Sequence, residues 1–287
     1  LTFPKPAQKT SIELNNLGEK YYKGQGVDQN YTKAIEYYLQ SAQKGNPNAL
    51  NRLGDIYRKG EGVEKNLPKA LQYYKQSAQK GNSQSLFHIG NCFYKGEGVK
   101  QNFEKAFIFY QQSAQQGNSN AMNSLGVCYK NGEGVQKNVS KAFKYFKESA
   151  DKGNSSALNH LGNCYFNGDG VQSNFFKAFE CYQKSAEQGN SDALNNLGFC
   201  YKNGKGVQQD QNKAFEYYTQ SALQSNSNAL NNIGFCFKTG KGVEQSFSKA
   251  IEYYQKSSEQ GNSNALYNLG VCYYKGEGVE QSYIKAV

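Results

Sequence analysis

The sequence predicts an all-α solenoid of about eight helix–loop–helix repeats, each 36 residues long. One observation is a glycine after Leu or Ile that returns every 36 residues, at Gly18, Gly54, Gly90, Gly126, Gly162, Gly198, Gly234 and Gly270. Another is a glycine before Val, at Gly26, Gly62, Gly98, Gly134, Gly170, Gly206, Gly242 and Gly278. A third is the helical spacing of apolar residues, as in Ala49, Leu50, Leu53, Ile56 and Tyr57. A fixed period of about 20–50 residues indicates stacked repeats.

The repeats occupy nearly the whole chain. Residues 1–9 do not fit the period, and Pro4 and Pro6 argue against a helix there, so we expect a tail. The repeats are expected at 10–45, 46–81, 82–117, 118–153, 154–189, 190–225, 226–261 and 262–287. The last repeat is incomplete. Because terminal repeats need a polar cap, we expect further chain or a partner to cover it.

Each repeat carries signals for two helices, A and B. Helix A starts at a capping residue, Thr10 in the first repeat and Asn46 or its equivalents later, and ends at the first glycine of a G-x-G-V loop. Helix B starts at Asn30, Asn66 and their equivalents and ends at a glycine, except at Ser225. A left-handed serine costs about 1 kcal/mol or more, so we expect an irregularity after the sixth repeat.

The glycine inside every helix A needs a steric explanation. It costs about 1 kcal/mol relative to alanine at such a position. Its return in all eight repeats therefore predicts that the backbone of a neighbouring helix passes close to it.

The chain carries a formal net charge of +10. One lysine per repeat precedes an alanine, at Lys33, Lys69, Lys105, Lys141, Lys177, Lys213, Lys249 and Lys285. A charge repeated in register is typical of a solvated helix face whose lysine stems cover apolar surface. A nucleic-acid-binding tract is the alternative. No segment approaches the roughly 20 apolar residues of a membrane span.

Six of the seven cysteines are in register, at Cys92, Cys128, Cys164, Cys200, Cys236 and Cys272. Stacked helices lie about 8–10 Å apart, whereas a disulfide needs Cα atoms within about 7 Å. We therefore expect small buried apolar residues rather than disulfides or metal ligands. Cys181 is expected to be a lone thiol, with a bond to Cys164 as the alternative. This cysteine usage favours an intracellular, cytoplasmic location. Three sequons, at Asn30, Asn138 and Asn154, leave the endoplasmic reticulum lumen as the alternative.

The repeat pattern resembles a known family. L-G-x-x-Y, then G-x-G-V, K-A and S-A-x-x-G-N within 36 residues is similar to the Sel-1-like repeat, a relative of the tetratricopeptide repeat. The match extends over residues 10–287. The resemblance implies a right-handed superhelix of antiparallel helix pairs, with helix A lining the concave face, and adaptor or scaffold work in macromolecular assemblies. A cysteine-rich branch of the family bridges its two helices, but most repeats here hold one cysteine at another position.

Three rows of helix A residues point away from helix B and are the candidate partner-binding positions. The first row is a ladder of amides that could grip a peptide backbone, with two aromatic members: Asn15, Asn51, Phe87, Asn123, Asn159, Asn195, Asn231 and Tyr267. The second changes from polar to apolar: Glu19, Asp55, Asn91, Val127, Asn163, Phe199, Phe235 and Val271. The third is basic and lies at the end of helix A: Lys23, Arg58, Lys59, Lys95, Lys130, Lys202, Lys238 and Lys275.

Each row has a simpler explanation. Asparagine is common throughout the chain, a tail or the superhelical turn could cover the phenylalanines, and cations suit the end of a helix dipole.

The sequence favours a protein-interaction scaffold without catalytic activity. It contains no nucleophile motif, phosphate loop or metal-spaced cluster. The only histidines, His88 and His160, lie two repeats apart, about 20 Å by the stacking distance, and cannot share a site. We expect no cofactor, no small-molecule substrate and no membrane span. The expected partners are one or more proteins, bound through an extended or acidic segment or as co-subunits of a large complex. RNA binding by a helical-repeat protein is the alternative.

Overall fold

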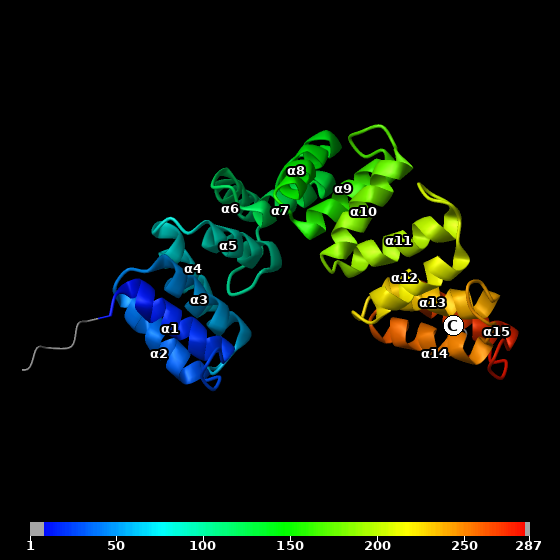
Figure 1. The fold of residues 1–287 in the computed structure, drawn as a ribbon, viewed down its shortest axis with the longest axis horizontal. Coiled ribbons are helices and arrows are strands. Elements are labelled where there is room, and N and C mark those ends of the chain that lie inside the picture. The colour runs from blue at the N-terminus through cyan, green and yellow to red at the C-terminus, as the bar shows by residue number, and fades with distance from the viewer. Residues whose placement is uncertain (1–8, 285–287) are drawn as a thin grey trace, which may run out of the picture. The chain divides into compact units, whose positions relative to one another are not determined.

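The computed structural model describes residues 9–284, which form fifteen α-helices and no strand (Figure 1). The predicted tail at 1–9 therefore falls, except for Lys9, outside the described residues. The odd-numbered helices are helix A of successive repeats: α1 (Ser11–Lys23), α3 (Pro47–Lys59), α5 (Ser83–Lys95), α7 (Ser119–Asn131), α9 (Ser155–Asn167), α11 (Ser191–Asn203), α13 (Ser227–Thr239) and α15 (Ser263–Lys275). The even-numbered helices are helix B: α2 (Tyr31–Gln43), α4 (Leu67–Gln79), α6 (Phe103–Gln115), α8 (Val139–Asp151), α10 (Phe175–Glu187), α12 (Gln211–Ala222) and α14 (Phe247–Glu259). The predicted all-α solenoid of helical repeats is confirmed.

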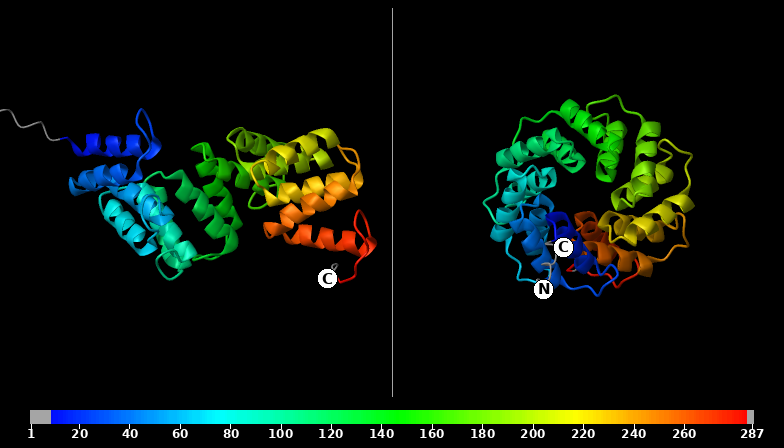
Figure 2. Two further views of the ribbon diagram at one scale, coloured as in Figure 1. Left: turned by 90° about the horizontal axis from the view of Figure 1, so that it is seen from below. Right: turned by 60° about the vertical axis from the view of Figure 1, so that its left-hand side comes forward.

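The chain divides into two compact units, an N-terminal unit of residues 1–145 and a C-terminal unit of residues 146–287, and α8 contributes to both. From α1 to α7 and from α9 to α15, each helix packs against its neighbours in the sequence (Figure 2). Helices A and B of one repeat thus form a helical hairpin, as α3 and α4 do, and helix B also packs against helix A of the next repeat, as α4 does against α5. Helices that are neighbours in sequence thus bury each other's apolar faces.

Helix boundaries follow the predicted caps. Thr10 and Glu13 form a capping box, and the side chain of Asn46 accepts hydrogen bonds from the backbone amides of Asn48 and Ala49. Each helix A ends at a glycine in the left-handed conformation, such as Gly60 at φ 79°. The sequence placed these signals correctly because capping is a local interaction.

Ser225 is the non-glycine residue with positive φ, 59°, among the described residues. It takes the place held by glycine at the end of helix B in the other complete repeats. Here α12 is one residue shorter than the other helices, and Leu223 after it is 83% exposed. The predicted irregularity is therefore confirmed as a shortened helix.

The backbone of a neighbouring helix does pass close to the glycine inside helix A, as expected, but a side chain lies closer still. A Cβ atom on Gly54 would lie 2.5 Å from the ring of Tyr74, a side chain of helix B in the same repeat. Backbone atoms lie farther from the added Cβ than the ring does. In the fifth repeat, a Cβ on Gly162 would lie 3.2 Å from the carbonyl oxygen of Ala178. The same contact occurs between Gly18 and Tyr38, Gly90 and Tyr110, Gly162 and Tyr182, Gly198 and Tyr218, and Gly234 and Tyr254. The glycine makes room for a fully buried aromatic ring.

Side chains between these rings complete the core. The Oγ of Ser77 donates to the carbonyl oxygen of Pro47 at 2.7 Å, which ties the end of helix B to the start of its own helix A. The register cysteines are buried thiols outside any disulfide, as expected, and Cys181 is a half-buried thiol outside any disulfide. Within residues 9–284, the lysines that precede alanine lie over aromatic rings, as Lys69 does at 4.2 Å from the Tyr57 ring centre. Their stems cover apolar surface, so this charge series is part of the fold.

Candidate functional site

The first candidate row joins one repeat to the next. The Oδ1 atom of Asn159 accepts a hydrogen bond at 2.9 Å from Nδ2 of Asn196, and Asn195 and Asn231 accept equivalent bonds from Asn232 and Asn268. In the N-terminal unit, Oδ1 of Asn51 accepts from Oγ of Ser85 at 2.7 Å, and Asn51 and Asn159 are buried. The expectation of freely presented amides is therefore corrected at Asn51, Asn159, Asn195 and Asn231, because their carbonyl oxygens already bind a neighbouring repeat.

The other members of this row differ from one another. Phe87 and Asn123 are half-buried, and the ring of Phe87 lies 6.0 Å from that of Tyr110. Tyr267 is 74% exposed. A peptide-binding role for the row stays a prediction.

The second row has two forms. In the second, third and fifth repeats, where it is polar, it accepts a hydrogen bond from the buried tyrosine of helix B: Tyr74 to Asp55, Tyr110 to Asn91 and Tyr182 to Asn163, each at 2.8 Å. In the first repeat Glu19 is polar as well, yet the buried hydroxyl of Tyr38 has no hydrogen-bond partner. Where it is apolar, that acceptor is missing. In the fourth repeat, Val127 occurs together with Phe146, which has no hydroxyl to satisfy.

The sixth and seventh repeats keep the tyrosine but lose the acceptor. Phe199 and Phe235 occupy the second row there, and the hydroxyls of Tyr218 and Tyr254 are buried without a hydrogen-bond partner. A buried hydroxyl left unpaired costs about 1–3 kcal/mol. Phe199 is also 42% exposed. These phenylalanines therefore weaken the hydrogen bonding of the fold and leave an aromatic group at the surface.

A small hollow adjoins Phe199 in the C-terminal unit. Its volume is about 200 Å³, and it is lined by Asn163, Phe166, Tyr182, Asn196 and Phe199. The rings of Phe166 and Phe199 meet edge to face, with their centres 5.8 Å apart. The hollow has apolar walls with amide groups beside them, which suits one apolar side chain of a partner. The second row of the eighth repeat, Val271, is half-buried.

The third row is basic, but its cations have different neighbours. Nε of Arg58 lies 3.3 Å from the Tyr74 hydroxyl, and Lys238 forms an ion pair with Glu277 at 2.8 Å. Lys130 is half-buried. The ammonium of Lys202 lies 4.1 Å from the ring centre of Phe235. Burial lowers the pKa of Lys202, and the nearby charge of Lys241 lowers it further.

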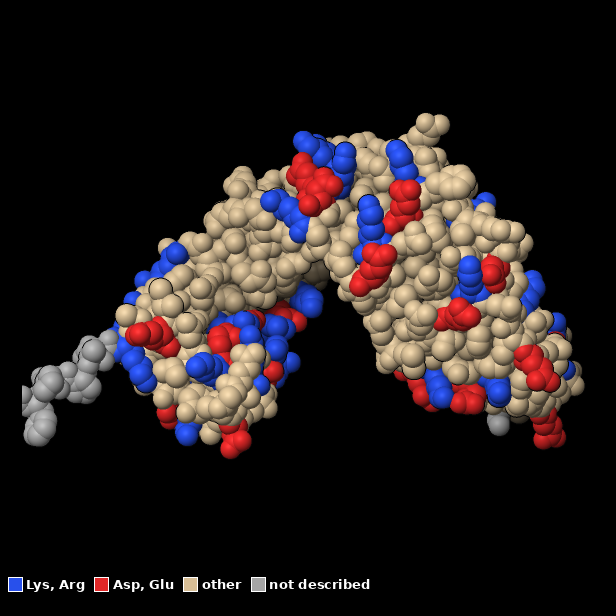
Figure 3. Space-filling view, viewed as in Figure 1, with Lys and Arg blue, Asp and Glu red and all other residues tan. Residues whose placement is uncertain are grey.

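A polar groove lies in the N-terminal unit, on α1, α3 and α5. It has a volume of about 680 Å³, and its walls include Glu19, Arg52, Asp55, Arg58 and His88. Figure 3 shows acidic and basic side chains gathered together on this unit. Burial would raise the pKa of Glu19, but Arg52 and Lys23 bring it below its ordinary value. The charges of this groove largely compensate one another.

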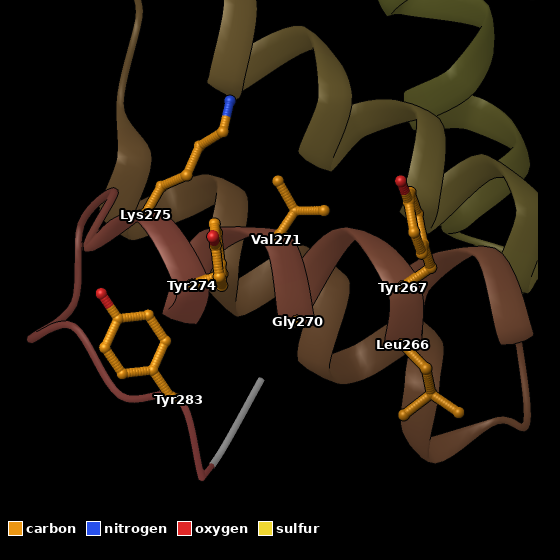
Figure 4. A pocket seen from close by; sticks show the side chains of 7 residues that line it. All are labelled: Leu266, Tyr267, Gly270, Val271, Tyr274, Lys275 and Tyr283. Atoms are coloured by element: carbon orange, nitrogen blue, oxygen red, sulfur yellow. The ribbon is translucent and has the colours of Figure 1, made fainter. Parts of the chain in front are cut away.

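Another hollow lies on α15 (Figure 4). Its volume is about 790 Å³, and Leu266, Tyr267, Val271, Tyr274 and Tyr283 contribute to its walls. Leu266 is 56% exposed, whereas its counterparts in the other repeats are buried, as Leu230 is at 8%. The difference arises because no described helix B covers α15.

The residue between the two glycines of G-x-G-V was not among the candidates predicted from the sequence. This loop residue is acidic in five repeats, at Glu61, Glu97, Glu133, Asp169 and Glu277, but it is lysine at Lys205 and Lys241. Lys205 lies 4.5 Å from the ring centre of Phe175. The signal was visible as a change of charge sign at one repeat position.

Residues 9–284 contain no group of three or more His, Cys, Asp or Glu side chains that could hold a metal ion. In the same range, no helix combines the length and apolar character needed to cross a membrane. The predicted sequons lie on caps: Asn30, Asn138 and Asn154 each accept a backbone hydrogen bond from their own helix.

The fold defines a helical-repeat protein built of stacked helical hairpins. A family model described as Sel1 repeat matches eight segments, at 14–46, 47–82, 83–118, 119–154, 155–190, 191–226, 227–262 and 263–287. The chain belongs to the Sel1 repeat family. Proteins of this repeat class are generally protein-interaction scaffolds, and the fold is typically non-catalytic.

Solved structures agree with this assignment. A Sel1 repeat protein from Oxalobacter formigenes is 28% identical with a TM-score of 0.76, and the match covers 85% of this chain and 96% of that one. The protective antigen c5321 of uropathogenic Escherichia coli, which displays an SLR fold, is 28% identical with a TM-score of 0.68, over 96% of this chain and 67% of that one. The immunity protein Pa5087 of Pseudomonas aeruginosa shares the fold at 23% identity and a TM-score of 0.53, over 78% and 84% of the two chains. No curated protein matches the sequence.

Proposed function

We propose that this protein is a non-enzymatic scaffold that holds an extended segment of a partner protein on the helix A face of its C-terminal unit. The observation that carries the proposal is the exposed aromatic group of Phe199 beside the hollow that it shares with Phe166. Exposed apolar groups at a hollow are typical of partner surfaces. The unpaired hydroxyl of Tyr218 argues that Phe199 does not serve the fold itself.

The basic side chains beside this surface favour an acidic partner segment. Lys202 and Lys238 follow Phe199 and Phe235 by three residues, so each lies on the same helix face as its phenylalanine. Electrostatic attraction of this kind raises association rates and selects partners. The lysines that precede alanine from Lys33 to Lys249 lie over aromatic rings instead, which leaves RNA binding with less support than a protein partner. Seven cysteines without a disulfide favour a reducing intracellular compartment.

Panning of a random 12-residue peptide display library tests the proposal. The protein should retain peptides, and Phe199→Ser should weaken their binding at least tenfold. Phe176→Ser is the matched control, because Phe176 is a 72% exposed phenylalanine on helix B, in α10. Binding that is lost equally in both variants, or only in the Phe176 variant, would refute the helix A face as the binding surface.

A further inference from the structure

At three junctions between repeats, the end of helix A contacts the G-x-G-V loop of the next repeat. In the N-terminal unit, the hydroxyl of Tyr22 donates to Oε2 of Glu61 at 2.6 Å, and that of Tyr94 donates to Glu133 at 2.8 Å. In the C-terminal unit, Lys238 pairs with Glu277 at 2.8 Å. The two residues are 39 positions apart in all three pairs, so a donor on one repeat meets a carboxylate on the next.

The junction between the sixth and seventh repeats breaks this rule. By the same spacing, Lys202 faces Lys241, so two cations stand where the three junctions above place a donor and an acid. Within residues 9–284, no carboxylate lies within ion-pair distance of Lys202 or Lys241. Lys202 is half-buried, and its ammonium contacts only the electron-rich face of Phe235 at 4.1 Å.

This arrangement has a cost for the folded chain. A partly buried ammonium loses hydration, and a second cation nearby adds repulsion. The lowered pKa of Lys202 has both of these causes. Lys238, at the next junction, avoids the cost because the loop supplies the carboxylate of Glu277. The missing component at this junction is therefore one carboxylate.

The aromatic hollow lies on the same helix, one turn before this junction. Phe199 precedes Lys202 by three residues in α11, and its exposed ring borders the hollow of about 200 Å³. A ligand that reaches Lys202 and Lys241 along the helix A face would thus meet an apolar site next to the cationic one.

We propose that the junction of Lys202 and Lys241 binds a carboxylate of the partner, from an aspartate or glutamate side chain that neighbours an apolar residue seated against Phe199. The partner carboxylate takes the place that Glu277 holds beside Lys238. This proposal rests on the scaffold function and names the chemistry that the partner segment must bring. A carboxylate is favoured over a phosphate because the corresponding junctions in the same fold are built for carboxylates.

The probe is a 12-residue peptide selected by panning on the protein, synthesised with a fluorescent label, together with a form in which every Asp and Glu is replaced by Asn and Gln. We expect the acidic form to bind at least tenfold more tightly. Lys241→Glu should lower its affinity at least tenfold, because the new carboxylate pairs with Lys202. Lys184→Glu makes the same charge change on exposed helix B surface, in α10, and should change affinity less than twofold at about 0.15 M salt.

A second measurement separates lost binding from lost folding. Lys241→Glu should raise the melting temperature slightly, because it restores an ion pair like that of Lys238 and Glu277. The proposal fails if the amidated peptide binds as well as the acidic one, or if Lys241→Glu and Lys184→Glu act alike. It also fails if a 12-nucleotide oligouridine displaces the peptide from the wild type but not from the Lys241 variant, since the junction would then be a phosphate site.

If Phe199→Ser abolishes binding while Lys241→Glu does not, the carboxylate site is refuted and the scaffold function stands. If neither substitution changes peptide binding, the carboxylate site and the proposed scaffold function are both refuted.

Discussion

The hydroxyl of Tyr182 donates a hydrogen bond to Oδ1 of Asn163 at 2.8 Å, across the two helices of one repeat. In the next repeat, Phe199 occupies the place of Asn163, and the hydroxyl of the equivalent Tyr218 is buried without a partner. Tyrosine at this repeat position therefore stabilises the fifth repeat through its hydroxyl, whereas in the sixth repeat its hydroxyl is a buried polar group without a hydrogen bond.

This difference predicts opposite results for two identical substitutions. Tyr182→Phe should lower the free energy of unfolding by about 1 kcal/mol, because it removes a made hydrogen bond. Tyr218→Phe should leave it unchanged or raise it, because it removes a hydroxyl that has no acceptor. Urea unfolding followed by circular dichroism measures both. Equal destabilisation by the two changes would show that Tyr218 makes a hydrogen bond in solution.

The close contact between Gly54 and Tyr74 makes a second prediction. Alanine favours a helix over glycine by about 1 kcal/mol, so Gly54→Ala would stabilise an unconstrained helix. Its Cβ would instead lie 2.5 Å from the tyrosine ring, and overpacking of this kind costs about 1–3 kcal/mol. We expect a net loss of stability in urea unfolding.

A double-mutant cycle identifies the cause of that loss. Tyr74→Leu removes the edge of the ring that the new methyl group would strike. Combined with Gly54→Ala, it should destabilise the protein by less than the sum of the two single changes. Additive effects would mean that the backbone, rather than the ring, requires the glycine.

Local features of the fold could be predicted from the sequence because their causes are local. A cap such as Asn46 and a stop such as Gly60 depend on residues within one helical turn, and their types repeat in register. Even the exception at Ser225 was visible, since a serine in a glycine position changes the end of one helix. Contacts between helices were harder to predict from the sequence. The ring of Tyr74 against Gly54 depends on how the two helices of the hairpin pack.

The candidate site shows the same limit more strongly. Periodicity placed Asn159 and Phe199 on the outer face of helix A, but it could not show that Asn159 is bound to Asn196 of the next repeat. That bond depends on the rise between repeats, which sequence spacing does not contain. The change from Glu to Lys at Lys241 was readable, yet its meaning required the structural rule that joins positions 39 residues apart.

The register cysteines predict a pattern of thiol reactivity. Burial raises the pKa of Cys128 and of Cys200 to about 12, so almost no thiolate is present at neutral pH. At a pH of about 7.5, Cys128 and Cys200 of the native protein should therefore react very slowly with iodoacetamide. Half-buried Cys181, whose pKa burial raises to about 11, should react first of the seven. Mass spectrometry of tryptic peptides gives the order, and labelling in urea should remove it. Faster labelling at Cys128 or Cys200 than at Cys181 would contradict their burial.

His88 predicts how the stability of the N-terminal unit depends on pH. Its ring is stacked on Tyr74 with centres 4.8 Å apart, and it faces Asp55 at 3.7 Å together with Arg52 and Arg58. Burial lowers the pKa of His88 below its ordinary value, although Asp55 opposes this change.

The direction in which stability changes with pH follows from proton binding by the folded and unfolded states. As the pH falls through about 6.5, the unfolded chain takes up a proton at this position while the folded chain does not, so unfolding becomes easier. The loss continues until the pH reaches the lower pKa of the folded state, with a slope of at most about 1.4 kcal/mol per pH unit. Above pH of about 7, His88 is neutral in both states and contributes no slope.

His88→Asn tests this contribution, because Asn196 and Asn232 occupy the same repeat position elsewhere. Urea unfolding at pH 8 gives the cost of the substitution without titration, since both proteins are then neutral at this site. At pH of about 5.5, the variant should have lost less stability relative to pH 8 than the wild type has. Parallel pH curves for the two proteins would mean that His88 keeps its ordinary pKa in the folded state, with the attraction of Asp55 cancelling the effect of burial.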